Sequence, residues 1–411
     1  MIQKIIDLHI HSKFSRACSK DLELEKIAVA CEEKGIDIVS TGDFTHPIWF
    51  NSIKENLKEV GKTGLFKLKN VSSKTLFVIG TEISCVYKHK GKTRRVHLLV
   101  FAPNILAAEK FITSLEEKGV NLRSDGRPIM GVKGKEILEI CLSVDKQMVV
   151  VPAHAWTPWF SVFGSKSGYD SLEECFEELT PNIFAIETGL SSDPTMNRRL
   201  SSLDKIALVS NSDAHSLQNL GREANVILFE HNEDVTYSSL WKIIGSGDPK
   251  KFLYTIEFYP EEGMYYLDGH RTCRLSMSPA ETRSKKEICP KCKKKITVGV
   301  LSRVEELADR KDNKKLNNFV PHRYIVPLRE VIGDVYGVGK ISKKVELEYR
   351  NLLNKIGNEF RVLLDESIEN IKKYSLNPDV ALAIKNMREG RVKIEPGYDG
   401  VYGKVSMILK K

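Results

Sequence analysis

The feature of this 411-residue sequence that most constrains its fold is a regular alternation within about its first 250 residues. Short apolar runs alternate there with segments whose apolar residues recur at helical spacing, which is typical of repeated βα units. The predicted strands are Ile5–Ile10, Ile36–Thr41, Leu76–Thr81, Val96–Phe101, Met148–Pro152, Ile183–Glu187, Ile206–Asn211 and Asn225–Phe229. The predicted helices are Leu22–Lys34, Ile48–Val60, Ile105–Lys118, Lys135–Ser143, Ser171–Glu178, Pro194–Leu203 and Thr236–Ile244. About seven or eight such parallel strands indicate an α/β barrel related to the (β/α)8 type.

The pattern changes after Pro260. A short β-rich stretch, with a predicted strand at Lys295–Val300, leads into a series of helical segments and a final pair of strands. The sequence therefore predicts a barrel over residues 1–260, a small module over 261–300 and a mainly helical domain over 301–411. The helices expected in the last part are Arg303–Arg310, Val326–Tyr336, Lys340–Ile356, Glu359–Ile371 and Asp379–Gly390, followed by strands Val392–Ile394 and Gly403–Ile408.

The two halves of the chain differ in charge. Residues 1–264 contain 32 Lys and Arg against 35 Asp and Glu, a net charge of −3, whereas residues 265–411 contain 31 against 19, a net charge of +12. A basic surface indicates a polyanionic partner, for which nucleic acid is the usual candidate. Charge alone leaves open a lysine-rich, solvated surface without a partner.

Composition excludes several classes of protein. Hydrophobic residues make up 41% of the chain and charged residues 28%, which is the balance of a globular protein and not of a disordered or low-complexity one. No run approaches the ~18 apolar residues of a membrane span. The N-terminal residues lead into a predicted strand without the apolar region of a signal peptide. We therefore expect a cytoplasmic protein that does not bind membranes.

Three of the eight cysteines lie close together near the middle of the chain, in the order His270-x2-Cys273 and Cys289-x2-Cys292. A C-x2-C knuckle supplies two thiolates from one tight turn, and a second pair of ligands completes a tetrahedral site. A disulfide is disfavoured because a cytoplasmic chain keeps its thiols reduced. We therefore predict one structural Zn²⁺ held by His270, Cys273, Cys289 and Cys292.

Polar residues of the kind that bind metals gather at or near the ends of the predicted strands. Six of the ten histidines and three acidic residues follow this rule, at the end where parallel barrels build their active sites. Such a set predicts a cage for two or three divalent metals that cleaves a phosphoester, with Zn²⁺ or Mn²⁺ favoured over Mg²⁺ by the imidazoles. The alternative is that each histidine is a separate core or surface residue. The candidate ligands are His9, His11, Asp43, His46, Glu82, His97, His154, Asp213 and His215.

These residues resemble the polymerase and histidinol phosphatase (PHP) superfamily of metallo-phosphoesterases, over roughly residues 1–240. The H-x-H motif is His9 and His11, and the closing D-x-H motif is Asp213 and His215. The resemblance implies a distorted (β/α)7 barrel. In the second strand many members have Asp directly followed by His, whereas this chain has Asp43-Phe-Thr-His46, which leaves open whether Asp43, His46 or both bind metal. A further His of many members is absent, so a site with fewer metals is an alternative.

Longer segments resemble the endonuclease Q family across nearly the whole chain, namely residues 151–160, 187–194, 268–273 and 298–310. That resemblance implies a DNA-repair endonuclease that combines a PHP barrel, a zinc-binding module and a helical C-terminal domain. It further implies a nick on the 5′ side of uracil, hypoxanthine, xanthine or an abasic site, leaving 3′-hydroxyl and 5′-phosphate ends. We expect Asp213, Glu82 and His154 to be the catalytic residues, with Asp213 indispensable.

An enzyme that inspects a base must extrude it and needs aromatic faces beside the reacting group. Trp156, Trp159 and Phe160 follow His154 directly and predict a stacking wall, although a buried lid core fits them equally well. Gly337-Val-Gly339-Lys340 between two predicted helices is similar to a helix-hairpin-helix turn that binds phosphate through backbone N–H groups, with a plain turn as the alternative. The candidate substrate-binding residues are Arg16, Trp156, Trp159, Phe160, Lys166, Lys291, Lys293, Gly337, Gly339 and Lys340.

The expected partner is damaged duplex DNA, held by the basic second half of the chain. We further expect a monomer in the nucleoid, with a replication or repair sliding clamp as a second candidate partner. Two other functions stay open at this point. One is a small-molecule phosphoesterase of the histidinol-phosphatase kind, and the other is a non-catalytic, zinc-stabilised nucleic-acid-binding protein.

Overall fold

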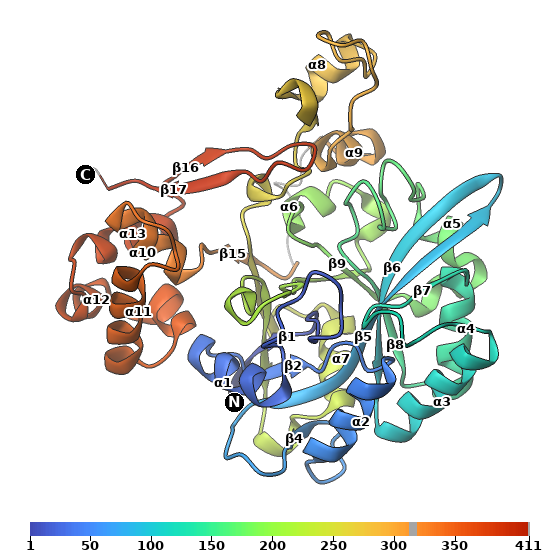
Figure 1. The fold of residues 1–411 in the computed structure, drawn as a ribbon, viewed down its shortest axis with the longest axis horizontal. Coiled ribbons are helices and arrows are strands. Elements are labelled where there is room, and N and C mark those ends of the chain that lie inside the picture. Colours follow the sequence, from blue (N-terminus) through green and yellow to red (C-terminus); the bar gives the residue numbers. More distant parts are fainter. Residues whose placement is uncertain (312–318, 410–411) are drawn as a thin grey trace.

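The computed structural model describes residues 1–311 and 319–409, and its first part is a barrel of seven strands surrounded by helices (Figure 1). Parallel pairing joins β1, β2 and β5, and also joins β9 and β10. Backbone bonds just beyond the strand ends complete the barrel, from Ala155 N to Glu187 O (3.0 Å) and from His11 N to Ala214 O (3.1 Å). The strands are β1 (Ile2–Asp7), β2 (Ile38–Ser40), β5 (Leu76–His89), β6 (Lys92–Ala102), β8 (Val149–Pro152), β9 (Ala185–Glu187) and β10 (Ala207–Val209).

The predicted α/β barrel is confirmed, but the expectation of parallel strands throughout it is wrong for β6. The chain leaves β5 through Lys90 and Gly91, whose φ angles are +48° and +76°, and returns at once as β6. Positive φ at both turn residues matches the twist of a two-residue hairpin, and a two-residue loop can only join antiparallel strands. β6 therefore runs antiparallel to both β5 and β8.

Further strands extend the barrel sheet beyond β1 and at its other edges. β11 (Ala224–Phe229) pairs antiparallel with β1, β12 (Phe252–Glu257) pairs with β11, and β15 (His322–Tyr324) pairs parallel with β12. β11 agrees with the predicted strand Asn225–Phe229, whereas β12 and β15 lie outside the predicted strands. The short edge strands β3 (Leu57–Glu59), β4 (Phe66–Leu68) and β7 (Ile129–Met130) were not predicted either.

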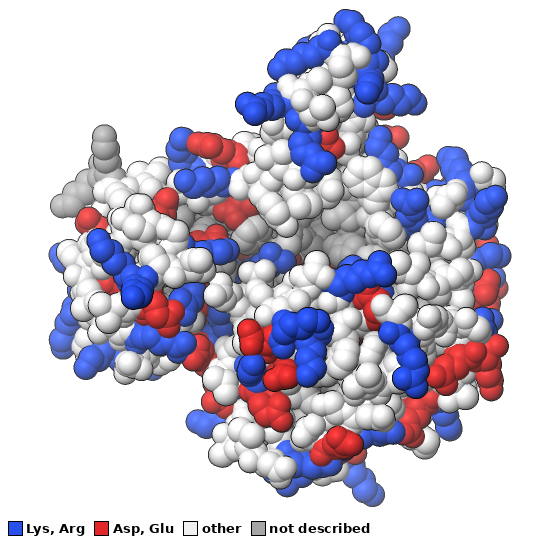
Figure 2. Space-filling view, in the orientation of Figure 1, with Lys and Arg blue, Asp and Glu red and all other residues white. Residues whose placement is uncertain are grey.

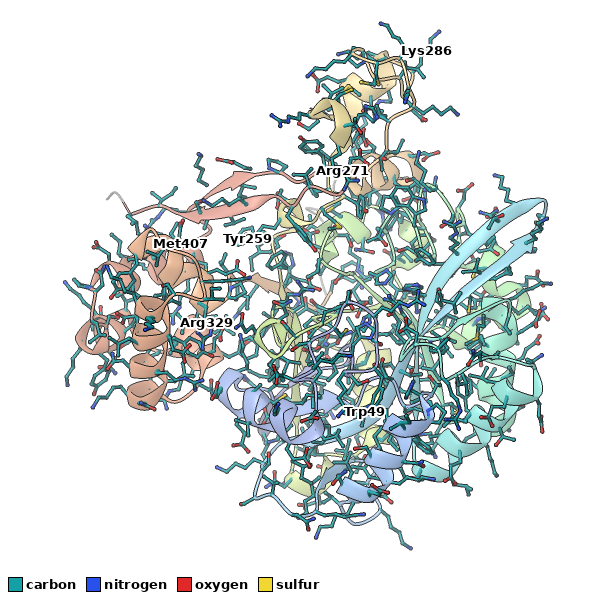
Figure 3. All side chains as sticks on the ribbon, in the orientation of Figure 1. Trp49, Tyr259, Arg271, Lys286, Arg329 and Met407 are labelled. Carbon is teal, nitrogen blue, oxygen red and sulfur yellow. The ribbon has the colours of Figure 1, made fainter. Side chains whose placement is uncertain are left out.

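Seven helices lie along the barrel portion, close to the predicted positions. In α1, helical spacing puts four buried residues on one face: Leu24, Ile27, Ala28 and Cys31. Gly35 ends the helix at φ +91°, and its N–H donates to Cys31 O. After β2, the indole of Trp49 donates to Gly42 O (2.8 Å) and holds the turn that carries Asp43 (Figure 3). The helices are α1 (Leu24–Lys34), α2 (Pro47–Asn56), α3 (Ile105–Glu117), α4 (Gly134–Val144), α5 (Leu172–Phe176), α6 (Pro194–Asn197) and α7 (Tyr237–Ser246).

Residues 261–300, called the Cys–His module below, project from the barrel (Figure 1). The module contains the hairpin of β13 (Asp268–His270) and β14 (Leu275–Met277) and the short α8 (Pro279–Ser284), and Lys286 lies at its outer end (Figure 3). The predicted strand at Lys295–Val300 is wrong, because only isolated bridges form there, at Lys295 and Thr297. The helix α9 (Val300–Leu307) follows.

The helical domain packs at the side of the barrel, and the final ribbon crosses toward the Cys–His module (Figure 1). The predicted helix Glu359–Ile371 is broken into a π-helical turn at Arg361–Asp365 and α12, because the Ser367 side chain caps a new helix by accepting from Asn370 N. Among the described residues, no helix is long and apolar enough to cross a membrane. The elements are α10 (Leu328–Tyr336), α11 (Lys343–Ile356), α12 (Ile368–Tyr374), α13 (Asp379–Arg388), β16 (Val392–Glu395) and β17 (Lys404–Met407).

Candidate active site

Six of the nine predicted metal ligands meet at one end of the barrel and form what we call the six-residue cluster. They make two groups that share Glu82, and in each group the candidate ligand atoms lie within 4.8 Å of one another. Each side chain comes from a strand or from the residues just after one, which is where a barrel places its site. The first group is His9, His11, Glu82 and Asp213, and the second is Glu82, His97 and His154.

The donor atoms of the cluster fit a divalent metal. His9 Nε2 is buried without a hydrogen-bond partner, 3.5 Å from Glu82 Oε2 and 3.4 Å from Asp213 Oδ1. His11 Nε2 lies 3.3 Å from the same Glu82 oxygen. Imidazole nitrogens and carboxylate oxygens that converge in this way are the usual ligands of Zn²⁺ and Mn²⁺.

Two buried carboxylates fix the histidine rings from behind. Glu187 lies 3.0 Å from His9 Nδ1 and also accepts from His154 N (2.7 Å). Asp43 lies 3.1 Å from His11 Nδ1 and accepts from Ser12 N (2.7 Å). A carboxylate on the second nitrogen of a metal-binding histidine sets its tautomer and orientation. In this geometry Asp43 supports a candidate ligand and lies outside the two groups.

His46 and His215 also lie outside the two groups. The ring of His46 stacks on Phe14 at 4.3 Å, and its buried Nδ1 has no hydrogen-bond partner, so metal binding by His46 stays a prediction. His215 lies at the edge of the cluster, with its ring 4.6 Å from that of His11 and its Nδ1 2.8 Å from Asp213 O. His215 therefore lies next to the cluster, whereas His46 packs on Phe14.

Sequence reasoning missed two residues of this site. Glu187 ends a predicted strand, and a carboxylate at the C-terminal end of a buried strand was a signal that could have been read. Arg127 comes from a loop and places Nη1 3.0 Å from Glu82 Oε2. No spacing in the sequence links Arg127 to β5, so only the folded chain reveals this contact.

The backbone at the site adopts conformations that residues other than glycine rarely occupy. Asp43, His154 and Asp213 have φ angles of +49°, +29° and +46°. Left-handed conformations of this kind carry strain and recur at functional sites. Gly189, at φ +68°, lies against His154, and a Cβ added to residue 189 would lie 2.6 Å from the Cβ of His154. The loop after β9 can therefore approach His154 only because residue 189 is glycine.

Burial and neighbouring charges set the protonation of the cluster. Burial lowers the pKa of His97 to about 4, so its ring is neutral and able to bind a metal. Burial opposes ionisation of Glu82, yet the charge of Arg127 and a hydrogen bond with His11 hold its pKa well below the ordinary value. Burial acts in the same sense on Asp213, where His9 and His11 keep the pKa low. The two carboxylates are therefore charged, and they in turn raise the pKa values of His9 and His11.

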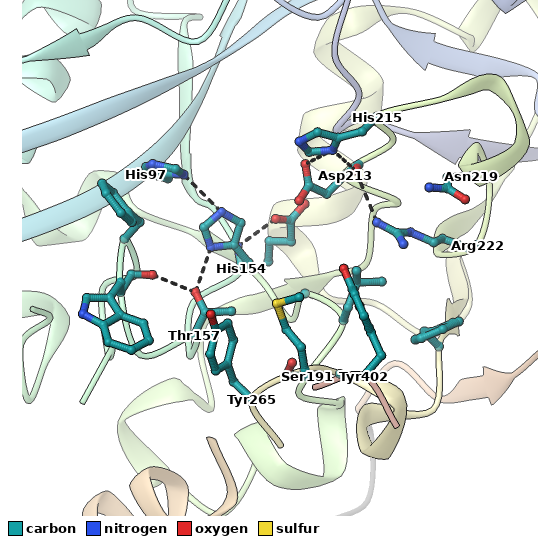
Figure 4. A pocket seen from close by; sticks show the side chains of 18 of the residues that line it. His97, His154, Thr157, Ser191, Asp213, His215, Asn219, Arg222, Tyr265 and Tyr402 are labelled. Atoms are coloured by element: carbon teal, nitrogen blue, oxygen red, sulfur yellow. Dashed lines mark hydrogen bonds and ion pairs between the residues drawn. The ribbon is translucent and has the colours of Figure 1, made fainter. Parts of the chain in front are cut away.

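The cluster opens into a cavity of about 720 Å³ (Figure 4). Three parts of the chain line it, since Tyr265 comes from the Cys–His module and Tyr402 from the segment before β17. Trp159 and Phe160 also line it, and the ring of Trp159 meets that of Tyr265 edge to face at 5.6 Å. Trp156 does not, because its side chain is buried against Phe163 and donates to Asn197 Oδ1 (2.7 Å). The prediction that Trp156 binds substrate is therefore corrected to a core role.

Two predicted phosphate-binding residues of the barrel make other contacts. The exposed Arg16 side chain pairs with Asp125 (3.2 Å), and its backbone N–H binds the same carboxylate. Lys166 donates to Ile296 O (3.2 Å), so it fastens the barrel to the Cys–His module. Lys166 therefore connects two parts of the chain through this hydrogen bond.

The four residues of the predicted structural zinc site come together in the folded chain. The ligand-type atoms of His270, Cys273, Cys289 and Cys292 lie within 4.8 Å of one another. Cys289 N binds Lys294 O (2.8 Å), which shapes the turn between the last two cysteines. Beside it Lys293 is exposed, and Lys291 donates to Cys273 O (2.9 Å).

The glycine turn of the helical domain lies between α10 and α11. Gly337 ends α10 at φ +65°, where its N–H binds Asp334 O and Gly333 O. Gly339 is exposed and no atom lies within 4 Å of the position that a Cβ would take. Lys340 pairs with Glu330 at 2.8 Å. The turn therefore presents backbone and one partly neutralised lysine to solvent.

The chain resembles known proteins in parts and as a whole. A family model described as the MJ0043 C-terminal domain matches residues 327–391. The uncharacterised protein MJ0043 of Methanocaldococcus jannaschii is 33% identical over 263 residues, which are 63% of this chain and 32% of that protein. The chain thus spans about a third of the length of that relative. The uncharacterised protein YqxK of Bacillus subtilis is 29% identical over 97% of this chain and 98% of its own length.

Solved structures match the whole chain. The lesion-specific endonuclease PfuEndoQ of Pyrococcus furiosus is 31% identical, with a TM-score of 0.86 over 99% of this chain and 96% of that one. The chain belongs to the endonuclease Q family. A second endonuclease Q structure, solved with a 27-mer duplex that has an abasic lesion at the active site, is 32% identical with a TM-score of 0.86, over 99% of this chain and 97% of that one. The match confirms the PHP fold, including the Cys/His cluster and the helical C-terminal region.

Proposed function

We propose that this protein is a metal-dependent DNA-repair endonuclease that nicks duplex DNA on the 5′ side of a deaminated base or an abasic site, leaving 3′-hydroxyl and 5′-phosphate ends. The observation that carries the proposal is the six-residue cluster on the wall of an aromatic cavity. It occurs in a chain that matches endonuclease Q from end to end, including the complex with an abasic duplex.

His9, His11, Glu82 and Asp213 would hold one divalent metal, and Glu82, His97 and His154 would hold a second, with Zn²⁺, Mn²⁺ and Mg²⁺ as candidates. Divalent metals at such a site polarise a phosphoryl oxygen and lower the pKa of water. The shared carboxylate of Glu82 ties the two groups together. His215, whose ring lies 4.6 Å from that of His11, is a candidate ligand for a third metal.

The protein's own residues provide position and charge for the reaction. Asp213 is the member of the first group that reaches the cavity, with a quarter of its side chain exposed, so it would contact both metal and attacking water. The His154 ring is held by Ser161 Oγ, 3.1 Å from Nδ1, which turns Nε2 toward Glu82 (3.1 Å). Arg222 lines the opposite rim and donates to Ser212 O (2.8 Å) (Figure 4).

The cavity has the size and lining to accept an extruded base. Its volume of about 720 Å³ lies within the range of small-molecule pockets. A flipped base can stack on the aromatic faces of Trp159, Phe160, Tyr265 and Tyr402. Tyr402 is 64% exposed and so accessible to a ligand. These rings come from the barrel and from both later parts of the chain, so a base would be enclosed only when all three are in place.

The second half of the chain would hold the duplex through its phosphates. The +12 charge of residues 265–411 includes Lys291 and Lys293, and blue side chains surround the protruding module (Figure 2). The Cys–His cluster would bind one structural Zn²⁺ and keep this loop in shape. Gly337, Gly339 and Lys340 would add backbone and charge contacts that do not read sequence.

Labelled duplexes test the proposal directly. The protein is incubated with Mn²⁺ or Mg²⁺ and duplexes that contain uracil, hypoxanthine, xanthine, an abasic site or no lesion, and the nick is mapped. We expect a single nick 5′ to the lesion and none in the intact duplex. Hydrolysis of a soluble phosphomonoester without any nick would favour a small-molecule phosphoesterase, and binding without cleavage would favour a non-catalytic binding protein. The monomeric state, the nucleoid location in the cytoplasm and the sliding clamp stay predictions.

A further inference from the structure

The hairpin of β5 and β6 reaches beyond the barrel from the six-residue cluster (Figure 1). Its strands pair without interruption from Ile79 with Ala102 to His89 with Lys92. Glu82 and His97 lie near the base of this ribbon, and Lys90 and Gly91 form its tip. A continuously paired two-stranded ribbon has few internal degrees of freedom, so its tip is held at a defined distance from the cluster.

The charge of this ribbon is one-sided. Residues 83–108 contain five Lys and Arg and no Asp or Glu. Lys88 and Lys90 are exposed, and within residues 1–311 and 319–409 neither they nor Arg95 form an ion pair. A solvated surface usually mixes both signs of charge, so a segment with one sign and no internal partners indicates an anionic ligand.

The two faces of the ribbon have different roles. Successive side chains of a strand alternate between faces, so Lys88 shares the face of Glu82, six residues earlier. Arg95 lies on that face too, because it pairs with Val86, which is two residues from Lys88; His97 joins them through its pairing with Ser84. Arg95 lines the cavity, and its guanidinium lies 5.6 Å from the Phe160 ring.

The opposite face is packed against the barrel. The rings of Tyr87 and Tyr169 are joined through their hydroxyls (3.0 Å), and His89 Nδ1 lies 2.8 Å from the same Tyr169 hydroxyl. Arg94 stacks over the Tyr169 ring at 4.1 Å. The face that carries Arg95 and Lys88 is therefore supported from behind and leads away from the cluster.

We propose that the cluster-side face of this hairpin, with Arg95, Lys88 and the tip residue Lys90, is a phosphate track for the duplex on one flank of the lesion. The inference rests on the proposed function and adds a contact surface in the barrel itself, apart from the Cys–His module and the helical domain. At about 3.3 Å per residue, Lys88 lies on the order of 20 Å from Glu82 along the strand. That span corresponds to about six base pairs of B-DNA.

The test compares binding of an abasic duplex with about 15 base pairs on each flank by four proteins: the wild type, Lys88→Gln/Lys90→Gln, the charge-preserving Lys88→Arg/Lys90→Arg, and the control Lys62→Gln/Lys67→Gln. Lys62 and Lys67 are equally exposed lysines, with Lys67 on β4 at the end of the barrel away from the module (Figure 1). We expect the Gln pair at the hairpin to raise Kd about three- to tenfold and to lower the salt slope by about 1.8, that is about 0.9 for each phosphate contact. The arginine pair and the control should bind as the wild type does.

Shortened duplexes locate the contact. When one flank is cut to about three base pairs, the phosphates under the hairpin are gone, and wild type and hairpin variant should bind that duplex equally. Cutting the other flank should leave the difference intact. An unchanged Kd and salt slope for the hairpin variant on the long duplex, or a loss that is the same on both shortened duplexes, would overturn the track. If the wild type nicks no damaged duplex, both the proposed function and the phosphate track are wrong. If the wild type nicks normally and the hairpin variant has the Kd and salt slope of the wild type, only the phosphate track is wrong.

Discussion

Glu82, His9 and His11 at the centre of the barrel site are buried, whereas the described lysines of residues 265–411 are exposed. Glu82 and His11 have no exposed side-chain surface and lie 3.3 Å apart, and Arg127 contacts Glu82 at 3.0 Å. Lys291 and Lys293 in the Cys–His module are open to solvent. Buried charges act strongly on a reacting group and are shielded little by salt, whereas exposed charges attract a polyanion and are screened. Under the proposed function, the contrast assigns cleavage to the barrel cluster and most of the duplex binding to the later modules.

The largest effect is expected from removing the cluster carboxylate that reaches the cavity. Asp213→Asn keeps the shape of the side chain but loses the charge that the cluster holds, so we predict a loss of nicking greater than about 100-fold. Binding to an abasic duplex should stay unchanged, because the exposed modules are intact. Nicking rate and Kd are measured on the same duplex, and normal cleavage by the variant would remove Asp213 from the mechanism.

A second change tests the support behind the ligands. Glu187→Gln weakens the hold on His9 Nδ1, and we expect activity or metal affinity to fall about 10- to 100-fold. The matched control is Glu257→Gln, because burial raises the pKa of Glu257 to about 8 and glutamine resembles the protonated carboxyl. Metal titration and nicking are measured for both variants. Equal effects of the two substitutions would mean that Glu187 acts only through stability.

A smaller effect, on affinity alone, is expected from the Cys–His module. Cys289→Ser removes a predicted zinc ligand, so elemental analysis should find one zinc fewer per chain. We predict that Kd for the abasic duplex rises about tenfold or more as the basic loop loses its shape. The cleavage rate of bound duplex should change little by comparison. A variant that loses zinc and still binds like the wild type would show that the module does not hold DNA.

Much of the site could be read from the sequence because strand ends carry their own signal. His9 and His11 are two residues apart at the end of an apolar run, so strand alternation predicts that they point the same way. Asp213 follows another apolar run, and the ends of barrel strands meet at one end of the barrel. The pairing of β5 with β6 was harder, because the apolar runs do not show that a two-residue turn replaces a helix. Glu82 and His97 were assigned to the site, but through parallel strands.

The rest depended on tertiary packing. Trp156 and Trp159 stand three residues apart in one loop, and only the fold shows that the first is buried and the second lines the cavity. Asp43 and His46 were equal candidates by type, and the hydrogen bonds to His11 and Ser12 separated them. Arg127 contacts Glu82, which lies 45 residues away in the chain, and no local pattern encodes that contact.

One measurement tests the division between cleavage and binding most directly. Kd for an abasic duplex and the single-turnover nicking rate at saturating enzyme are both followed from about 50 to 200 mM salt. Because the exposed charges are screened and the buried cluster is not, we predict that Kd rises steeply while the saturated cleavage rate stays nearly constant. A cleavage rate that falls in parallel with affinity would contradict the account.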